Sequence, residues 1–222
     1  MENKFSILIF NVECLMVFIS FLFSLKLMSC QNERHMKGFL LFCFIATVVM
    51  IPLFLDNNFI IKLVWSDNFN NYSLIFNFGF LSIFIIKCYP NKMGLKYSIL
   101  IFICFLILII FSLFTKSSLK SNYFAFSLNH LGLIIFSANY LHKLFNNIPN
   151  KPLSQIPEFW VVIAVFFCSV VNFPVVYIIS VLVKNGMNDF MNNFLIRNLS
   201  NFGYIVMYTL FIHSFKISVK NG

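Results

Sequence analysis

Seven long apolar segments, separated by short polar stretches, run along the chain. Each is close in length to the roughly 20 apolar residues that an α-helix needs to cross the hydrocarbon core of a bilayer. The intervening stretches, such as 29–37, 89–96 and 146–158, are rich in Asn, Pro, Gly and Lys, which favour turns and loops. The pattern therefore predicts seven membrane spans, at Phe5–Leu25, Gly38–Leu55, Phe69–Ile86, Tyr97–Thr115, Tyr123–Leu144, Phe159–Val183 and Phe194–Phe215.

These spans are expected to be helices, because backbone polar groups in lipid must be satisfied within the spanning structure. A transmembrane β-barrel would need strands that alternate between apolar and polar residues. Segments such as Ser98–Ser112 are continuously apolar and show no such alternation. We therefore predict an all-α polytopic transmembrane bundle that forms one domain over residues 1–222. The third span is the weakest of the seven, because Asn70, Asn71 and Asn77 interrupt it.

The composition supports a membrane protein and excludes several other classes. Hydrophobic residues make up 60% of the 222 residues and charged residues only 10%, whereas soluble domains carry about 25% charged residues. This balance excludes a soluble enzyme and a disordered tail. The six cysteines form no CxxC or other metal-ligand spacing, and most lie inside apolar runs, so we interpret them as small buried hydrophobes.

The distribution of basic residues predicts the orientation of the bundle. With seven spans, one side carries six basic residues: Lys4, Lys62, Lys116, Lys120, Lys184 and Arg197. The other side carries ten: Lys26, Arg34, Lys37, Lys87, Lys92, Lys96, Lys143, Lys151, Lys216 and Lys220. By the positive-inside rule, the N-terminus is expected outside and the C-terminus in the cytoplasm. The net charge of +9 is scattered over short loops, which does not favour nucleic-acid binding.

Polar residues inside the spans are the candidates for function, because polar groups in hydrocarbon are costly. The alternative for each is a structural hydrogen bond between helices. Glu13 is the only acidic residue well inside an apolar segment, about two turns into the first span. It is a candidate for a proton-coupled switch or a ligand contact.

The fifth span is the most polar, and Asn129, His130 and Asn139 lie in it. Small and polar residues recur there at helical spacing, as expected for a helix that lines a pocket or an interhelical seam. His130 is the best single candidate for a site residue. Asn77 in the third span and Asn172 in the sixth complete the predicted ligand-binding set. Pro174, close to Asn172, is expected to kink the sixth helix.

Several chemistries lack support in the sequence. It contains no HExxH, GxSxG, P-loop or GxGxxG motif. His130 and His142 are twelve residues apart, about 18 Å along one helix, so they cannot ligate the same haem iron. We therefore predict no catalytic residue, no metal site and no cofactor, and we expect that the protein is not an enzyme.

Two segments at the fifth and sixth spans resemble a known family, and the resemblance covers about the last third of the chain. They are YLHKLF at 140–145 and IPEFWVVIAVFF at 156–167, in which Pro157, Phe159 and Trp160 form a Pro-x-Phe-Trp pattern. This is similar to small bacterial seven-helix membrane proteins that serve as the sensory regions of two-component histidine kinases. The segment 202–215 is similar in character. No kinase follows the last span, so the resemblance implies that a signal passes to a separate protein.

Two functional hypotheses follow. The first is a non-enzymatic sensor or signalling subunit in the bacterial cytoplasmic (inner) membrane. Its outward-opening pocket would take a small molecule or lipid, and a separate cytoplasmic partner such as a histidine kinase would read the change. The second is a structural or accessory subunit of a larger membrane complex, transporter or channel. A transporter typically shows inverted repeats with matching broken helices, and none is evident in the sequence.

Overall fold

The computed structural model is all-helical, which confirms the predicted fold class. It describes residues 2–29, 34–59, 66–88, 93–115, 123–147, 151–184 and 194–221. Within these residues there are seven α-helices: α1 (Glu2–Leu25), α2 (Arg34–Phe59), α3 (Ser66–Lys87), α4 (Met93–Thr115), α5 (Tyr123–Asn146), α6 (Pro157–Lys184) and α7 (Phe194–Asn221). Two short 3-10 helices, η1 (Lys26–Ser29) and η2 (Leu153–Gln155), follow α1 and precede α6. Every predicted span lies within one of the seven α-helices.

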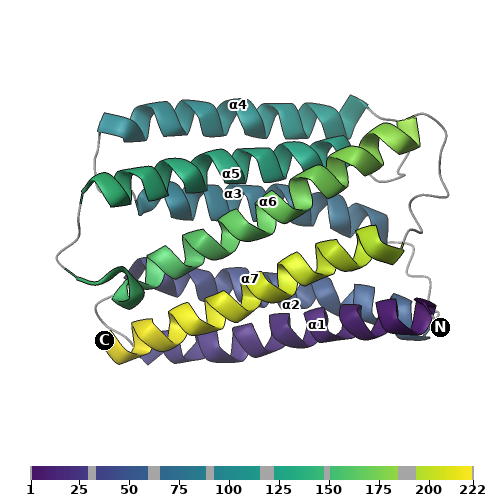
Figure 1. Cartoon of the computed structure of the whole chain (residues 1–222), viewed down its shortest axis with the longest axis horizontal. Helices are drawn as coiled ribbons and strands as arrows, with labels where there is room; N and C mark the ends of the chain where they lie inside the picture. Colours follow the sequence, from purple (N-terminus) through teal and green to yellow (C-terminus); the bar gives the residue numbers. More distant parts are fainter. Residues whose placement is uncertain are drawn as a thin grey trace.

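Successive helices run in opposite directions, so the two ends of the chain lie at opposite ends of the bundle (Figure 1). Among the described residues, six helices are long and apolar enough to cross a membrane. For α3, the apolar stretch found among the described residues is the shorter Ser73–Lys87. The chain is therefore a multi-pass integral membrane protein. Lys62, Lys92, Lys116 and Lys120, which entered the charge count, lie outside the described residues, and the orientation stays a prediction.

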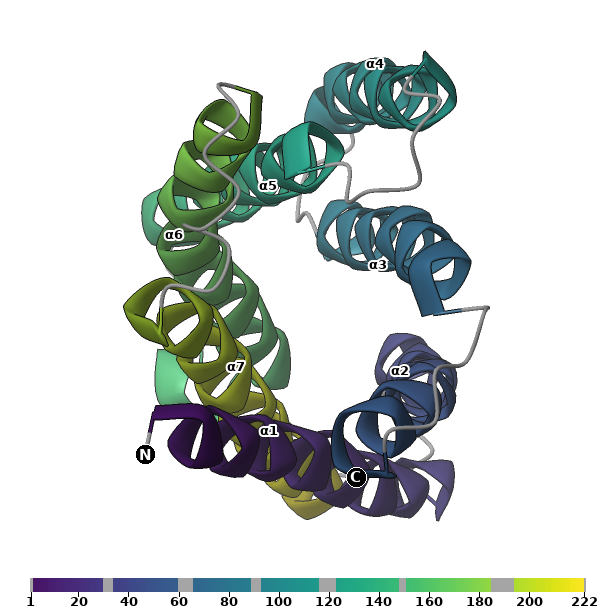
Figure 2. The same cartoon turned by 90° about the vertical axis from the view of Figure 1, so that its right-hand side faces the viewer.

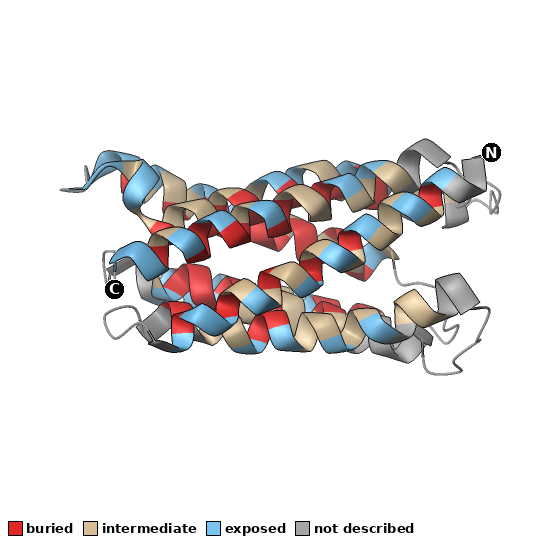
Figure 3. Ribbon diagram, turned by 90° about the horizontal axis from the view of Figure 1, so that it is seen from below, coloured by how far each residue is buried: buried red, intermediate tan, exposed pale blue. Residues whose placement is uncertain are grey.

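Six helices form a ring in the order α1, α2, α3, α5, α6 and α7, and α7 packs back against α1 (Figure 2). Helix α4 lies outside this ring, against α3 and α5. Buried and exposed residues alternate along the helices, and the buried ones gather on the sides of the ribbons that face the middle of the bundle (Figure 3). Many of the exposed side chains are large and apolar, including Leu15, Leu100, Phe111 and Tyr177. This outer surface suits contact with lipid.

The segment that carries the Pro-x-Phe-Trp pattern forms the start of α6. Pro157 is the first helical residue, a position that suits proline because its missing N–H has no helical acceptor there. The Trp160 indole Nε1 donates to the Ser154 carbonyl oxygen at 3.0 Å, which ties α6 to η2. The Ser214 hydroxyl donates to the Pro157 carbonyl oxygen at 2.8 Å. These bonds fix the beginning of α6 against the second half of α7.

Candidate functional site

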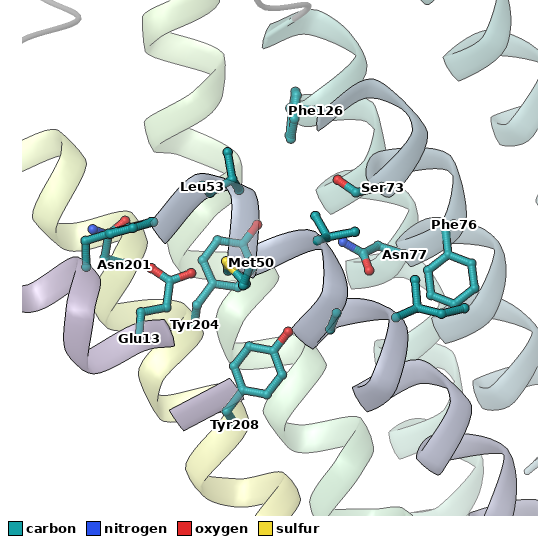
Figure 4. Close-up of a pocket in the computed structure, with 14 residues that line it drawn as sticks. Glu13, Met50, Leu53, Ser73, Phe76, Asn77, Phe126, Asn201, Tyr204 and Tyr208 are labelled. Carbon is teal, nitrogen blue, oxygen red and sulfur yellow. The ribbon is translucent and has the colours of Figure 1, made fainter. Parts of the chain in front are cut away.

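A cavity of about 220 Å³ lies inside the ring, in the half of the bundle nearer the N-terminus of the chain. Helices α1, α2, α3, α5 and α7 all contribute to its wall (Figure 4). The lining residues are Phe10, Glu13, Ile45, Ala46, Val49, Met50, Leu53, Ser73, Phe76, Asn77, Phe126, Asn201, Tyr204 and Tyr208. We call this space the central cavity. It exceeds the engineered cavity of about 150 Å³ that accommodates benzene in another protein, so it has room for a small organic group.

The polar groups of the central cavity come from three helices. Glu13 of α1 is only 4% exposed, and Asn77 of α3 lies on the same cavity wall. Asn201, Tyr204 and Tyr208 share one face of α7, because they are three and four residues apart. Within the described part of the chain, Asn201 Nδ2 is buried without a hydrogen-bond partner. The central cavity therefore presents an unused hydrogen-bond donor.

A smaller cavity of about 30 Å³ continues the site toward α5 and α6. It shares Asn77, Tyr204 and Tyr208 with the central cavity, and it adds Asn129 and His130 to the wall. The other lining residues are Phe42, Leu81, Leu133, Val165, Cys168, Ser169 and Met207. This volume is enough for a water molecule, which needs at least about 10–15 Å³ and two or more polar partners.

Asn129 and His130 reach the smaller cavity from α5. Their side chains are 4% and 3% exposed. Among the described residues, Asn129 Oδ1 and His130 Nδ1 have no hydrogen-bond partner. The His130 ring lies 6.4 Å from the Tyr204 ring, measured between centroids. An unsatisfied buried polar group costs about 1–3 kcal/mol, so a cluster of such groups around one space indicates a site for water or a ligand.

Phenylalanine rings fill the bundle on the other side of these cavities. Phe39 of α2 lies at their centre, with its ring centroid 4.5 Å from that of Phe84 in α3 and 5.2 Å from that of Phe211 in α7. Phe42 and Phe80 stack 5.0 Å apart next to it. We call the six rings of Phe39, Phe42, Phe80, Phe84, Phe211 and Phe215 the aromatic cluster. Along α2, α3 and α7 it lies next to the cavities, toward the end of the bundle that holds the C-terminus.

Of the six predicted ligand-binding residues, four line the two cavities: Glu13, Asn77, Asn129 and His130. Asn172 does not. It is 0% exposed, donates from Nδ2 to the Cys168 carbonyl oxygen at 2.9 Å and accepts a hydrogen bond from the Ser200 hydroxyl. Its role is to join α6 to α7. Asn139 is half-buried and lines neither cavity.

Helix α6 continues through Pro174 to Lys184. Proline leaves the carbonyl of the residue four positions earlier without its helical partner, which here is Val170. The Asn172 side-chain amide donates to the Cys168 carbonyl oxygen and not to that of Val170. The kink expected at Pro174 stays a prediction.

Two further histidines, His142 and His213, line neither cavity. His142 is exposed and its Nε2 is 3.0 Å from Asn146 Nδ2. His213 is exposed and packs against the Trp160 ring at 4.7 Å between centroids. The described residues contain no group of three or more His, Cys, Asp or Glu side chains that could hold a metal ion.

Sequence reasoning missed the contribution of α7, which supplies Asn201, Tyr204 and Tyr208 to the central cavity. A signal was available: these residues recur at intervals of three and four, the spacing of one helical face. Comparisons of the chain with protein-family models, with curated proteins and with solved structures find no match. The resemblance to bacterial sensory regions stays a prediction, and the function must be inferred from the site.

Proposed function

We propose that this protein is a non-enzymatic membrane sensor that binds a small ligand in the central cavity and passes the signal to a separate partner. The observation that carries the proposal is the convergence of unsatisfied polar groups on a space that is closed on one side. Among the described residues, Asn129 Oδ1 and His130 Nδ1 at the smaller cavity and Asn201 Nδ2 at the central cavity have no hydrogen-bond partner. The aromatic cluster separates that space from the other end of the bundle.

A space that is closed at one end suits a receptor better than a channel, because a channel needs a path through the bundle. It also suits a receptor better than a purely structural subunit. A structural subunit has no use for an unpaired histidine nitrogen and an unpaired asparagine oxygen at the same cavity, since both lower its stability. Natural proteins accept such costs mainly at functional sites.

Helix α7 connects the ligand site to the end where a partner would bind. Tyr204 and Tyr208 line the central cavity, and Phe211 and Phe215 belong to the aromatic cluster further along the same helix. The helix ends at Asn221, whose Nδ2 donates to the Gln155 carbonyl oxygen at 3.1 Å. A ligand that favours one packing of α7 would alter this end, provided that its affinity for the two packings differs.

The proposal includes the predicted orientation, with the N-terminus outside and the C-terminus in the cytoplasm of a bacterium. The positive-inside pattern supports it. In this orientation the central cavity lies toward the outside and the aromatic cluster toward the cytoplasm. The partner would be a histidine kinase or another signalling protein, which the resemblance to sensory regions supports.

The test is to purify the chain, tagged at its C-terminus, from its native membrane in mild detergent and to identify the proteins that accompany it. We expect a histidine kinase or response regulator. The matched variant Tyr204→Phe removes one hydroxyl from the cavity and should leave the amount of partner unchanged while it weakens signalling output. Recovery of a stoichiometric transport or structural complex, with output unaffected by this variant, would contradict the proposal.

A further inference from the structure

The smaller cavity has the size and the wall of a site for a single polar group. Its volume is about 30 Å³, close to the share of volume that one molecule has in liquid water. Asn129 and His130 are neighbours on α5, line the cavity, and are 4% and 3% exposed. Among the described residues, Asn129 Oδ1 and His130 Nδ1 have no hydrogen-bond partner. An occupant that bonds to both would remove the cost of leaving these buried atoms unpaired.

The smaller cavity adjoins the central cavity along three side chains. Asn77, Tyr204 and Tyr208 line both spaces (Figure 4). The Tyr204 ring is also the one that lies 6.4 Å from the His130 ring between centroids. A group in the smaller cavity therefore lies next to the space that would hold the body of a ligand.

The two unpaired atoms select the chemistry of the occupant. Asn129 Oδ1 only accepts hydrogen bonds, whereas His130 Nδ1 donates in one neutral tautomer and accepts in the other. A hydroxyl group both donates and accepts, so one O–H group can donate to Oδ1 and accept from Nδ1–H. A carboxylate has no donor for Oδ1 and more atoms than this space holds. A methyl group would leave both atoms unpaired.

The wall of the smaller cavity favours a neutral occupant. The residues described on that wall include no Asp, Glu, Lys or Arg. An ion that leaves water for a buried site is costly unless a paired charge faces it. An alcohol or a water molecule meets the requirement without such a charge.

We propose that the smaller cavity is a hydroxyl site, in which one O–H group lies between Asn129 and His130. Water fills it in the unliganded protein, and the hydroxyl group of an alcohol ligand takes the same place. The part that concerns the ligand rests on the proposed function and gives the sensor a preference for alcohols. A site built to bond a hydroxyl group rejects analogues that lack it, because its own buried polar groups are then left unpaired.

Solid-state NMR of the full chain in lipid bilayers tests this inference, with ¹⁵N-labelled histidine and transfer of polarisation from water. The signals of His130 are those that disappear in His130→Gln. We expect transfer from water to the His130 ring, with the exposed His142 as the positive control. Asn129→Leu should abolish the transfer to His130, and Asn129→Ser, which keeps a hydroxyl acceptor, should retain it. Asn139→Leu is the matched change on the same helix and should have no effect, because Asn139 lines neither cavity.

Two small probes distinguish water from a ligand hydroxyl group as the source. With ¹³C-methanol, a contact between its carbon and the His130 ring, together with loss of the water transfer, shows that an alcohol takes the site. Water transfer that methanol leaves unchanged shows a bound water alone, which supports the hydroxyl site and overturns the preference for alcohols. Methylammonium should bind about tenfold more weakly than methanol, the factor that corresponds to 1.4 kcal/mol.

Three results would overturn the inference. They are the absence of water transfer to His130 when His142 receives it, transfer that Asn129→Leu leaves unchanged, and displacement of the water by methylammonium as readily as by methanol. None of these measurements depends on the recovery of a partner protein, so this inference and the proposed function can fail separately.

Discussion

Asn129 lines the smaller cavity and Asn172 joins α6 to α7. Substitution of the same residue type therefore compares the stability effect of a cavity residue with that of a helix–helix contact. Both side chains are buried, at 4% and 0% exposure, on the neighbouring helices α5 and α6. Asn129 Oδ1 has no partner among the described residues, whereas Asn172 bonds to Cys168 and to Ser200. We predict that replacement by leucine lowers the free energy of unfolding at Asn172 but not at Asn129.

The size of each expected change in the free energy of unfolding follows from the surroundings of the residue. Asn172→Leu removes the hydrogen bond between α6 and α7, which is worth about 0.6 to 1.7 kcal/mol in a membrane bundle. It also places a branched side chain where the helices approach closely, since a Cβ added at Gly203 would lie 2.9 Å from Asn172 Nδ2. We expect a loss of about 2 kcal/mol in the free energy of unfolding. Asn129→Leu removes an unsatisfied acceptor, which costs about 1–3 kcal/mol when buried, so we expect no loss or a gain of about 1 kcal/mol.

The assay is reversible unfolding of the purified protein in mixed detergent micelles, followed by circular dichroism. Far-ultraviolet spectra of the two variants under native conditions provide the control for helix content. The reasoning would be refuted if Asn129→Leu lowered stability as much as Asn172→Leu. That result would mean that Asn129 is part of the packing rather than of a site.

Three further predictions concern other parts of the bundle. Gly132→Ala should destabilise the contact of α5 with α3, because the new Cβ would lie 2.6 Å from the buried Phe78 ring. Gly79→Ala is the matched change, because a Cβ added there would have nothing within 4 Å. It should be neutral or stabilising by up to about 1 kcal/mol in thermal denaturation. Phe39→Ala should cost about 3–5 kcal/mol in the same assay, because it empties the centre of the aromatic cluster. Trp160→Phe should cost about 1 kcal/mol in the same assay through loss of its hydrogen bond to η2.

The helices were predictable from the sequence because apolar length alone defines them. Each of the seven predicted spans lies within one α-helix. The third was the weakest, and the structure gives the reason: Asn77, which interrupts its apolar pattern, lies on the wall of both cavities. The local irregularity that made this span uncertain therefore also marks the site.

The membership of the site was only partly predictable. Residue type and depth identify a polar side chain in a span, but they do not tell whether a neighbouring helix satisfies it. Asn129 and Asn172 looked alike in the sequence, and only the packing of α6 against α7 distinguishes them. Tyr204 and Tyr208 were overlooked because tyrosine within an apolar helix is compatible with ordinary packing.

One-sided access to the cavity tests the central claim most directly. A variant with Asn77→Cys, in a background free of the native cysteines, is treated with a membrane-impermeant thiol reagent in sealed vesicles of each orientation. Leu100→Cys on the lipid-facing surface provides the unreactive control, and Lys220→Cys reports the C-terminal side. We predict that Asn77→Cys reacts only from the side that holds the N-terminus. Reaction from both sides, or from the C-terminal side alone, would contradict a cavity closed by the aromatic cluster.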